Sequence, residues 1–265
     1  MNVASHLKNQ NHYLIKIAGV VSLLLVACSL LWLLSYNQDV TQNNQLVVTP
    51  KTDYITKQTT KGQKNKLTLP DGSQIILNAD SKLRFANTFS TDKERAVYLE
   101  GEAFFDVARD TSRPFVIYTQ KTATRVLGTS FNINAYRDNQ VISVAVVSGE
   151  VQVKRLESKN AAQPINLVSG EKAICDVKND VQIKKTAFSY DREIVWKDGT
   201  LNFYKEDFET VAKKLEMWYG KKIIIKKRNI KNDFTGTYHN KSLKVVLEGI
   251  SYVLDFDYVI EEEKI

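Results

Sequence analysis

The residues best suited to chemistry form one short stretch, YLEGEAFFDVARD, at residues 98–110. Its four carboxylates surround a glycine and two phenylalanines: Glu100, Glu102, Asp106 and Asp110. Acids among apolar residues can have their pKa values pushed apart, so that one serves as acid and another as base or nucleophile. If residues 102–108 form a strand, however, Glu102 and Asp106 share a face roughly 13 Å apart. That separation exceeds the roughly 5 to 9.5 Å that glycoside hydrolysis needs.

Glu100 approaches Glu102 only through a turn at Gly101, so one carboxylate pair stays open as a candidate site. The same Gly-Glu pair precedes two later alternating segments, at residues 149–150 and 170–171. Glycine supplies the positive φ that such turns need, and the Glu after it is most simply a solvated first residue of a strand. A catalytic acid is seldom needed three times. We therefore interpret these acids as facing solvent.

The same stretch also contains apolar residues that alternate with the acids. Phe105 and Val107 fall on the opposite face from Glu102 in a strand, and Ala103 lies between the turn and this apolar face. We expect Phe105 and Val107 to be buried.

No other catalytic or metal-binding set can be assembled from the sequence. Two of the three histidines, His6 and His12, lie near the N-terminus, and His239 stands alone in a turn. Zinc sites need three or four ligands, and a serine triad needs His and Asp partners. The sequence contains no Walker A motif and no GxGxxG. We predict no catalytic, cofactor-binding or metal-binding residues, and hence no enzyme.

Composition indicates a folded chain of two domains. It has 265 residues, of which 43% are hydrophobic and 25% charged, and these fractions exclude a largely disordered protein. The net charge of +7 and the basic segment 221–231 suggest nucleic-acid binding at first. The run Ile223 to Ile225 is better interpreted as a buried strand with solvated cations at its ends. We predict no nucleic-acid partner.

Residues 17–34, IAGVVSLLLVACSLLWLL, carry no charge and predict a single transmembrane helix. Lys8 and Lys16 precede this run and Asp39 is the first charge after it, which predicts a cytoplasmic N-terminus. Residues 1–16 would then be a short cytoplasmic segment. The rest of the chain would lie in the periplasm, anchored in the inner membrane.

Two other interpretations of this run stay open. Leu25 to Cys28 resembles a lipobox, which would make the protein a lipoprotein acylated at Cys28, and a plain cleaved signal peptide is the other. A lipoprotein normally continues from its cysteine into a polar tether, whereas residues 29–34 are mostly apolar. The second cysteine, Cys175, has no partner in the exported part, so we expect it to be a small buried residue.

Three regions follow the apolar run. Residues 35–66 are rich in Asn, Gln, Thr and Lys and predict a linker. Residues 67–185 contain many short alternating segments separated by glycine turns, which predicts an all-β domain. Residues 141–147 are apolar on both faces and predict a strand buried on both sides.

Residues 194–265 predict an α+β C-terminal domain of two β-α-β units. The first would comprise a strand at 200–204, a helix at 205–219 and a strand at 222–226; Gly220 would end the helix. The helix carries one apolar stripe of Phe208, Val211, Leu215 and Trp218. The second unit would comprise a strand at 234–238, a helix capped by Ser242 and a closing strand at 256–260.

The order of several motifs resembles one known family. They are LPDGSQIILN at 69–78, SKLRF at 81–85, VYLEGEAFFDV at 97–107, RPF at 113–115, VLGTSF at 126–131 and VSGEV at 147–151. Together they resemble the FecR-family transmembrane anti-sigma factors, and residues 196–219 look like the C-terminal domain of the Bacteroidota-type members. That domain is similar to the short β-α-β domain of secretins and TonB-dependent transducers.

The resemblance implies a signalling role and two protein partners. The periplasmic signalling domain of an outer-membrane TonB-dependent transducer would bind the C-terminal domain, and the signal would cross the span to an extracytoplasmic-function sigma factor. Because the C-terminal domain resembles the short domain of the transducers, we expect the two to bind by strand addition at a sheet edge or by helix packing. As the edge we choose Phe234, Thr235, Gly236, Thr237 and Tyr238, because Thr-Gly-Thr leaves little side chain to block a partner.

The chain departs from this family at its N-terminus. FecR-type members usually place several dozen residues in the cytoplasm to hold the sigma factor, whereas only 16 residues precede the expected span here. Such a segment is too short and too polar to present groove-filling helices. Either the true start lies upstream of Met1, which we favour, or the protein senses without itself binding a sigma factor.

The alternative function is a membrane-anchored periplasmic adaptor that binds glycans or assists envelope assembly. Its aromatic side chains could stack on sugars, although strand core is their simpler use. The candidates are Tyr98, Phe104, Phe105, Tyr118 and Tyr136.

Overall fold

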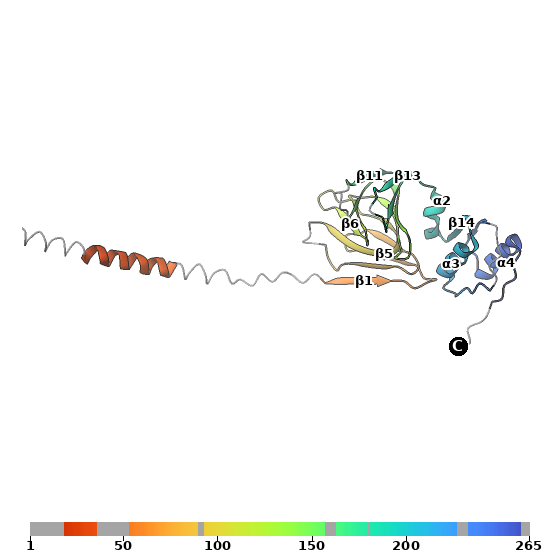
Figure 1. The fold of residues 1–265 in the computed structure, drawn as a ribbon, viewed down its shortest axis with the longest axis horizontal. Helices are drawn as coiled ribbons and strands as arrows, with labels where there is room; N and C mark the ends of the chain where they lie inside the picture. The colour runs from red at the N-terminus through yellow and green to blue at the C-terminus, as the bar shows by residue number, and fades with distance from the viewer. Residues whose placement is uncertain are drawn as a thin grey trace, which may run out of the picture. The chain divides into compact units, whose positions relative to one another are not determined.

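A computed structural model describes residues 19–35, 53–89, 93–156, 163–179, 181–226 and 233–260 of the protein (Figure 1). The chain forms two compact units, residues 1–51 and 52–265. In the first unit, residues 19–35 form one helix, which covers most of the expected span at 17–34. The expected cytoplasmic segment 1–16 lies outside the described residues. Within them, no helix is both long and apolar enough to span a membrane.

The second unit begins with a β domain, as the alternation predicted. Its described strands join into one sheet system with the order β11-β10-β7-β6-β5-β8-β9-β12-β13, and β4 with β1 and β3 with β2 branch from β5. The strands are β1 (Tyr54–Gln58), β2 (Asn65–Thr68), β3 (Gln74–Leu77), β4 (Lys82–Ala86), β5 (Arg95–Asp106), β6 (Phe115–Tyr118), β7 (Thr122–Val126), β8 (Ser130–Ala135), β9 (Val141–Ser148), β10 (Glu150–Arg155), β11 (Ile165–Val168), β12 (Glu171–Asp176) and β13 (Lys184–Ala187).

Strand β5 connects the two halves of this sheet system at Gly101. Its first half pairs with β4 and β6, and its second half pairs with β3 and β8. Gly101 has a φ of +99°, and a Cβ placed there would lie 2.3 Å from Ser81 Oγ. The expected turn at Gly101 is therefore wrong, because the glycine is a corner within one 12-residue strand.

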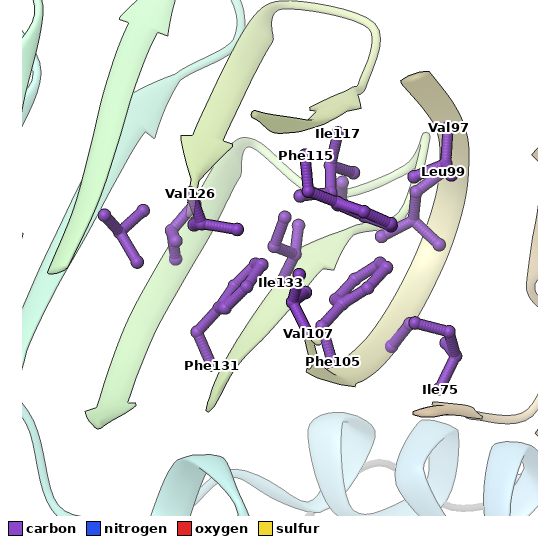
Figure 2. Close-up of a cluster of buried hydrophobic side chains, with 14 of the residues drawn as sticks. Ile75, Val97, Leu99, Phe105, Val107, Phe115, Ile117, Val126, Phe131 and Ile133 are labelled. Atoms are coloured by element: carbon purple, nitrogen blue, oxygen red, sulfur yellow. The ribbon is translucent and has the colours of Figure 1, made fainter. Parts of the chain in front are cut away.

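The core lies between the two halves (Figure 2). Phe115 and Val126 from one half converge on Phe105 and Phe131 from the other, and the rings of Phe105 and Phe131 stack at 5.2 Å. Such enclosure removes large apolar areas from water. The expected burial of Phe105 and Val107 is confirmed, and so is that of Cys175.

Two sequence-based expectations about the β domain need adjustment. Part of the expected linker is strand, because β1 pairs antiparallel with β4 from Tyr54↔Ala86 to Gln58↔Lys82. The β domain therefore starts before residue 67. Strand β9 is buried on both faces at its centre, as expected, but Val141 at its start is exposed.

The C-terminal domain is α+β, as expected, with one two-stranded antiparallel sheet among the described residues. In α3, Val211 and Leu215 are buried, Asp207 caps the first turn by accepting a bond from Thr210 N, and Gly220 ends the helix with a φ of 67°. Its elements are α2 (Tyr190–Glu193), the 3-10 helix η1 (Val195–Asp198), β14 (Thr200–Glu206), α3 (Phe208–Tyr219), β15 (Phe234–His239) and α4 (Leu243–Leu254).

The two expected closing strands are wrong. Residues 222–226 do not form a strand, because Glu216 Oε1 accepts the backbone N–H of Ile223 at 2.7 Å and Ile224 is 69% exposed. Residues 256–260 are also irregular, and Phe256 packs instead against Phe208 at 4.9 Å. The domain therefore comprises two β-α units among the described residues. Ser242 does precede α4, but its side chain makes no capping bond.

Candidate functional site

The four acids of the 98–110 stretch occupy different surroundings. Glu100 pairs with Arg137 at 2.9 Å, and Asp106 accepts a bond from Ser130 Oγ at 2.8 Å, both near solvent. Asp110 closes a turn by accepting bonds from Ser112 and Arg113, and the Ser112 hydroxyl is the main cause of its lowered pKa.

Glu102 contradicts the expectation that these acids face solvent. Glu102 is buried, with only 8% of its surface exposed. Asn78 Nδ2 donates to one carboxyl oxygen at 2.7 Å, and Asn132 Nδ2 donates to the other at 2.8 Å. Burial raises the pKa of Glu102, and the bonds from Asn132, Asn78 and Asn134 oppose that rise. Both oxygens are thus held by neutral amides within the protein.

Glu102 and Phe104 share the outer face of β5, and this face borders the C-terminal domain. Phe104 and Ala145 of the β domain form a buried cluster with Ile194 and Trp196 of the segment that begins the C-terminal domain. The side chains packed around this cluster come from both domains: Ile76, Val147, Phe188 and Trp218. We call this contact the junction.

Lys64 bridges the two domains at the junction. Its ammonium donates to the Trp196 backbone oxygen at 3.0 Å and lies 3.3 Å from the centre of the Trp218 ring. Burial lowers the pKa of Lys64 to about 8, although the charge of Glu102 acts in the opposite direction. The junction therefore contains a partly desolvated cation over an aromatic ring.

The backbones of the two domains also touch at two glycines. Gly62 N donates to Met217 O at 2.8 Å, at the end of α3. A Cβ on Gly62 would lie 2.9 Å from Gly220 N, and one on Gly220 would lie 2.7 Å from Lys61 O. This approach leaves no room for a side chain at either position.

Sequence reasoning missed the junction because its members are far apart in the chain. Gly62 and Lys64 lie in the segment that composition assigned to a linker. The available signal was the pair Trp196 and Trp218, two of the three tryptophans in the sequence.

The five residues chosen for partner binding form most of β15. Phe234 is buried in the domain core, and its ring lies against Gly236. Thr235 and Thr237 are exposed, and Tyr238 is half-buried beside Phe203. Strand β15 pairs with β14 on one side only, and no other strand among the described residues pairs with it. This arrangement leaves an edge for strand addition, which stays a prediction.

A second surface of the C-terminal domain was not predicted. Helix α4 buries Val246, Ile250 and Leu254, yet other apolar residues of the helix and of the segment after it face solvent. Tyr252 is 90% exposed and Val259 is 85% exposed. We call this set the α4 surface: Val245, Tyr252, Val253, Val259 and Ile260. A helix that is apolar beyond its core stripe is the signal that could have identified it.

No metal site is evident in these regions. Across the described ranges, no group of three or more His, Cys, Asp or Glu side chains is placed to hold a metal ion. His239 lies at the end of β15, where Nδ1 is 3.0 Å from Thr200 Oγ1 and Nε2 is 3.0 Å from Asn240 Nδ2.

Comparison with solved structures identifies the relatives of this two-domain arrangement. A crystal structure of a candidate anti-sigma factor from Parabacteroides distasonis ATCC 8503 at 2.50 Å resolution is 32% identical and superposes with a TM-score of 0.68. The match covers 80% of this chain and 97% of that chain. A 1.65 Å structure described in the same words matches equally, with 32% identity, 78% and 95% coverage and a TM-score of 0.67.

Two family models match this chain. The model described as FecR protein matches residues 55–152, and the one described as FecR, C-terminal matches residues 200–265. The chain belongs to the FecR family of anti-sigma factors. No curated protein matches significantly. Membership of an anti-sigma family gives the chain a regulatory role, and the family is not one of enzymes.

Proposed function

We propose that this FecR-family chain is the sensor part of a transmembrane anti-sigma regulator. In this proposal, the C-terminal domain binds the signalling domain of a TonB-dependent outer-membrane transducer in the periplasm. The apolar residues 17–34 cross the inner membrane with the N-terminus in the cytoplasm. The signal then changes how the regulator holds an extracytoplasmic-function sigma factor.

The α4 surface is the observation that carries this proposal. Exposed apolar residues gather in one short part of the chain, from Val245 to Ile260, and such patches mark contacts with other proteins. Tyr252 is the largest exposed side chain of the set, and tyrosine is enriched at the centres of interfaces. The unpaired edge of β15 adds a second surface, which a partner strand could extend.

The junction supports a relay between the domains. Lys64 and the glycine pair Gly62 and Gly220 hold the end of α3 against the β domain. A partner that binds the C-terminal domain more tightly when α3 has moved away from the β domain would weaken these contacts. A ligand shifts such an equilibrium only by its difference in affinity for the two arrangements.

The proposal is tested by transcription from a promoter that depends on the cognate sigma factor. The strains carry the full chain, the double variant Val245→Ser with Tyr252→Ser, or the control Val168→Ser, which changes an exposed valine of the β domain. We expect signal-dependent transcription with the full chain and the control, and loss of the response with the double variant. An unchanged response in the double variant would contradict the role of the α4 surface.

Glycan binding stays as a second candidate because of one aromatic group on the β domain. Tyr98 and Tyr118 stack at 5.5 Å, Tyr54 lies 6.2 Å from Tyr98, and the Arg84 guanidinium lies 4.0 Å from the Tyr54 ring centre. The other expected aromatics do not join it: Phe104, Phe105 and Tyr136 lie elsewhere and are largely buried.

A pull-down from cell-envelope extracts separates the two candidates. Recovery of glycan without a transducer, with recovery abolished by Tyr98→Ala, would favour glycan binding. Recovery of a transducer that depends on Tyr252 favours signalling.

A further inference from the structure

The junction contains two buried polar atoms that have no hydrogen-bond partner among the described residues. They are Trp196 Nε1, a donor, and Asn132 Oδ1, an acceptor. Trp196 is 8% exposed and Asn132 is 1% exposed. Buried donors and acceptors without a partner cost free energy and are uncommon in native proteins. Two such atoms make the closed junction less stable than its apolar packing alone would make it.

Asn132 lies on the face of the sheet that the C-terminal domain covers. It pairs with Phe104 of β5 on one side and with Ala145 of β9 on the other. Directly paired residues of antiparallel strands share a face, and Phe104 and Ala145 both pack with Trp196. Asn132 Nδ2 donates to Glu102 Oε1 at 2.8 Å, and exchanging the two ends of the amide would set Oδ1 against that carboxyl. The orientation of the amide is therefore fixed, and Oδ1 has no described donor in the closed junction.

Lys64 adds a charge that is partly withdrawn from water in the same contact. The Trp196 backbone oxygen accepts a bond from its ammonium, which also lies over the Trp218 ring. Burial lowers the pKa of Lys64 to about 8, so its charged form is less stable here than in water. The closed junction thus holds three polar groups that water would solvate better.

Other contacts favour the closed junction. The apolar side chains of the contact are removed from water. Gly62 N donates to Met217 O at 2.8 Å across the junction. Lys172 of β12 forms an ion pair with Glu193 of α2. Contributions of opposite sign therefore meet in one contact between the domains.

The two sides of the junction are built as separate bodies. The core clusters of the β domain and of the C-terminal domain share no residue. Helices α2 and η1, which carry Ile194 and Trp196 to the junction, contact β14 of the C-terminal domain. Asn202 of β14 donates from Nδ2 to the Asp191 backbone oxygen of α2 at 2.9 Å. Opening the junction therefore breaks neither core.

We propose that the junction is a two-state contact, which opens while both domains stay folded and gives water to Trp196, Asn132 and Lys64. A ligand shifts two arrangements by its difference in affinity for them, so a contact close to balance responds to a modest difference. The opening junction would be the switch within the proposed relay, and its use in signalling rests on that function. Opening itself needs no transducer and is measured on the chain alone.

Hydrogen exchange of the purified full-length chain in detergent tests this proposal, with single amides resolved by mass spectrometry. The Gly62 amide reports opening, because its bond to Met217 O crosses the junction. The Phe105 amide, in the ladders of β5 with β3 and β8, reports unfolding of the β domain. The Leu215 amide inside α3 reports unfolding of the C-terminal domain. After correction for intrinsic rates, we expect Gly62 to exchange at least about tenfold faster than either.

Trp196→Phe tests the unpartnered donor by the sign of its effect. The change removes Nε1 together with part of a buried ring, and lost packing alone would open the junction and speed exchange at Gly62. We expect exchange about fivefold slower than in the parent, because the closed junction no longer buries an unpartnered donor. Trp218→Phe is the matched control. Trp218 is half-buried and its ring carries Lys64, so this variant should speed exchange.

Gly220→Ala provides an independent way to open the junction. Its new Cβ would lie 2.7 Å from Lys61 O, which leaves no room for the close approach of the two backbones. We expect faster exchange at Gly62 and an unchanged rate at Phe105.

Two results would overturn the proposal. One is a corrected rate at Gly62 equal to that at Phe105 and Leu215 in the parent chain, because the junction would then open only when the protein unfolds. The other is exchange in Trp196→Phe as fast as in the parent or faster, which would show that packing alone governs the contact. The first result requires no variant. Loss of transducer binding, which would contradict the proposed function, leaves these rates unaffected.

Discussion

The β domain and the C-terminal domain use their apolar residues differently. In the β domain, large apolar side chains from both halves of the sheet system meet in one enclosed core, and Tyr54 and Tyr98 are exposed beside each other on its surface. In the C-terminal domain, a smaller core leaves several apolar residues of α4 and the following segment in water. In the proposed function, the first domain serves as a scaffold and the second offers its apolar surface to a partner.

The largest expected effect comes from the core of the scaffold. Phe131→Ala should lower the free energy of unfolding by about 3–5 kcal/mol, because it removes a fully buried ring that stacks on Phe105. Tyr252→Ser should change it by no more than about 0.5 kcal/mol, because that side chain is 90% exposed. Denaturant unfolding of the full chain measures both. A loss of unfolding free energy in Tyr252→Ser as large as that in Phe131→Ala would contradict this difference between an enclosed core and an exposed apolar surface.

The next effect compares one glycine from each domain. Gly101→Ala should cost about 2 kcal/mol or more, because its φ is positive and the new Cβ would meet Ser81. Gly249→Ala in α4 should change stability by no more than about 1 kcal/mol, because alanine favours helix and only the far end of Tyr238 must move. Thermal unfolding ranks the two variants. The reverse order would show that the corner in β5 is not a rigid element.

Glu102 predicts a pH dependence of the scaffold. Because burial raises its folded-state pKa above 4.5, the native state binds this proton more tightly than the unfolded state. Its contribution to stability is therefore largest at low pH and falls as the pH rises through the raised pKa. Unfolding free energies measured from pH 4 upward should fall less steeply in Glu102→Gln than in the parent chain. The same dependence of unfolding free energy on pH in both proteins would contradict a raised pKa at Glu102.

Lys64 at the junction should give a pH dependence of the opposite sign. Its folded-state pKa is about 8 against an ordinary 10.5, so the unfolded state binds the proton more tightly. Stability therefore rises with pH between about 8 and 10.5, and Lys64→Met should remove this rise. Lys57→Met, which changes an exposed lysine of β1, serves as the control and should retain it.

The β domain was the easier of the two regions to predict from sequence. Short alternating segments and glycine turns indicated its strands, and the alternation at Phe105 and Val107 identified core positions. Glu102 was misjudged because its burial depends on Asn78 and Asn132, which lie 24 and 30 positions away. Strand β1 was missed because its partner, β4, is also distant in the sequence.

In the C-terminal domain, local signals again worked better than distant ones. The apolar stripe and Gly220 correctly placed the end of α3, whereas residues 205–206, which we expected in the helix, belong to β14. The run Ile223 to Ile225 looked like a buried strand, but Glu216 of α3 takes the N–H of Ile223. The α4 surface was overlooked because the buried stripe of Val246 and Ile250 is enough to predict an amphipathic helix. The sequence pattern does not show that other apolar residues of the helix stay exposed, because that depends on which residues the core covers.

Direct binding to a transducer tests the central claim. The affinity of the purified full-length chain for the signalling domain of its cognate transducer should be measured for the parent, for Tyr252→Ser with Val259→Ser, and for Val168→Ser. The double variant removes two exposed apolar side chains of the α4 surface, and the control removes one from the β domain. We expect the double variant to weaken binding about tenfold or more and the control to leave it unchanged. Equal affinity of the parent and the double variant would contradict the account.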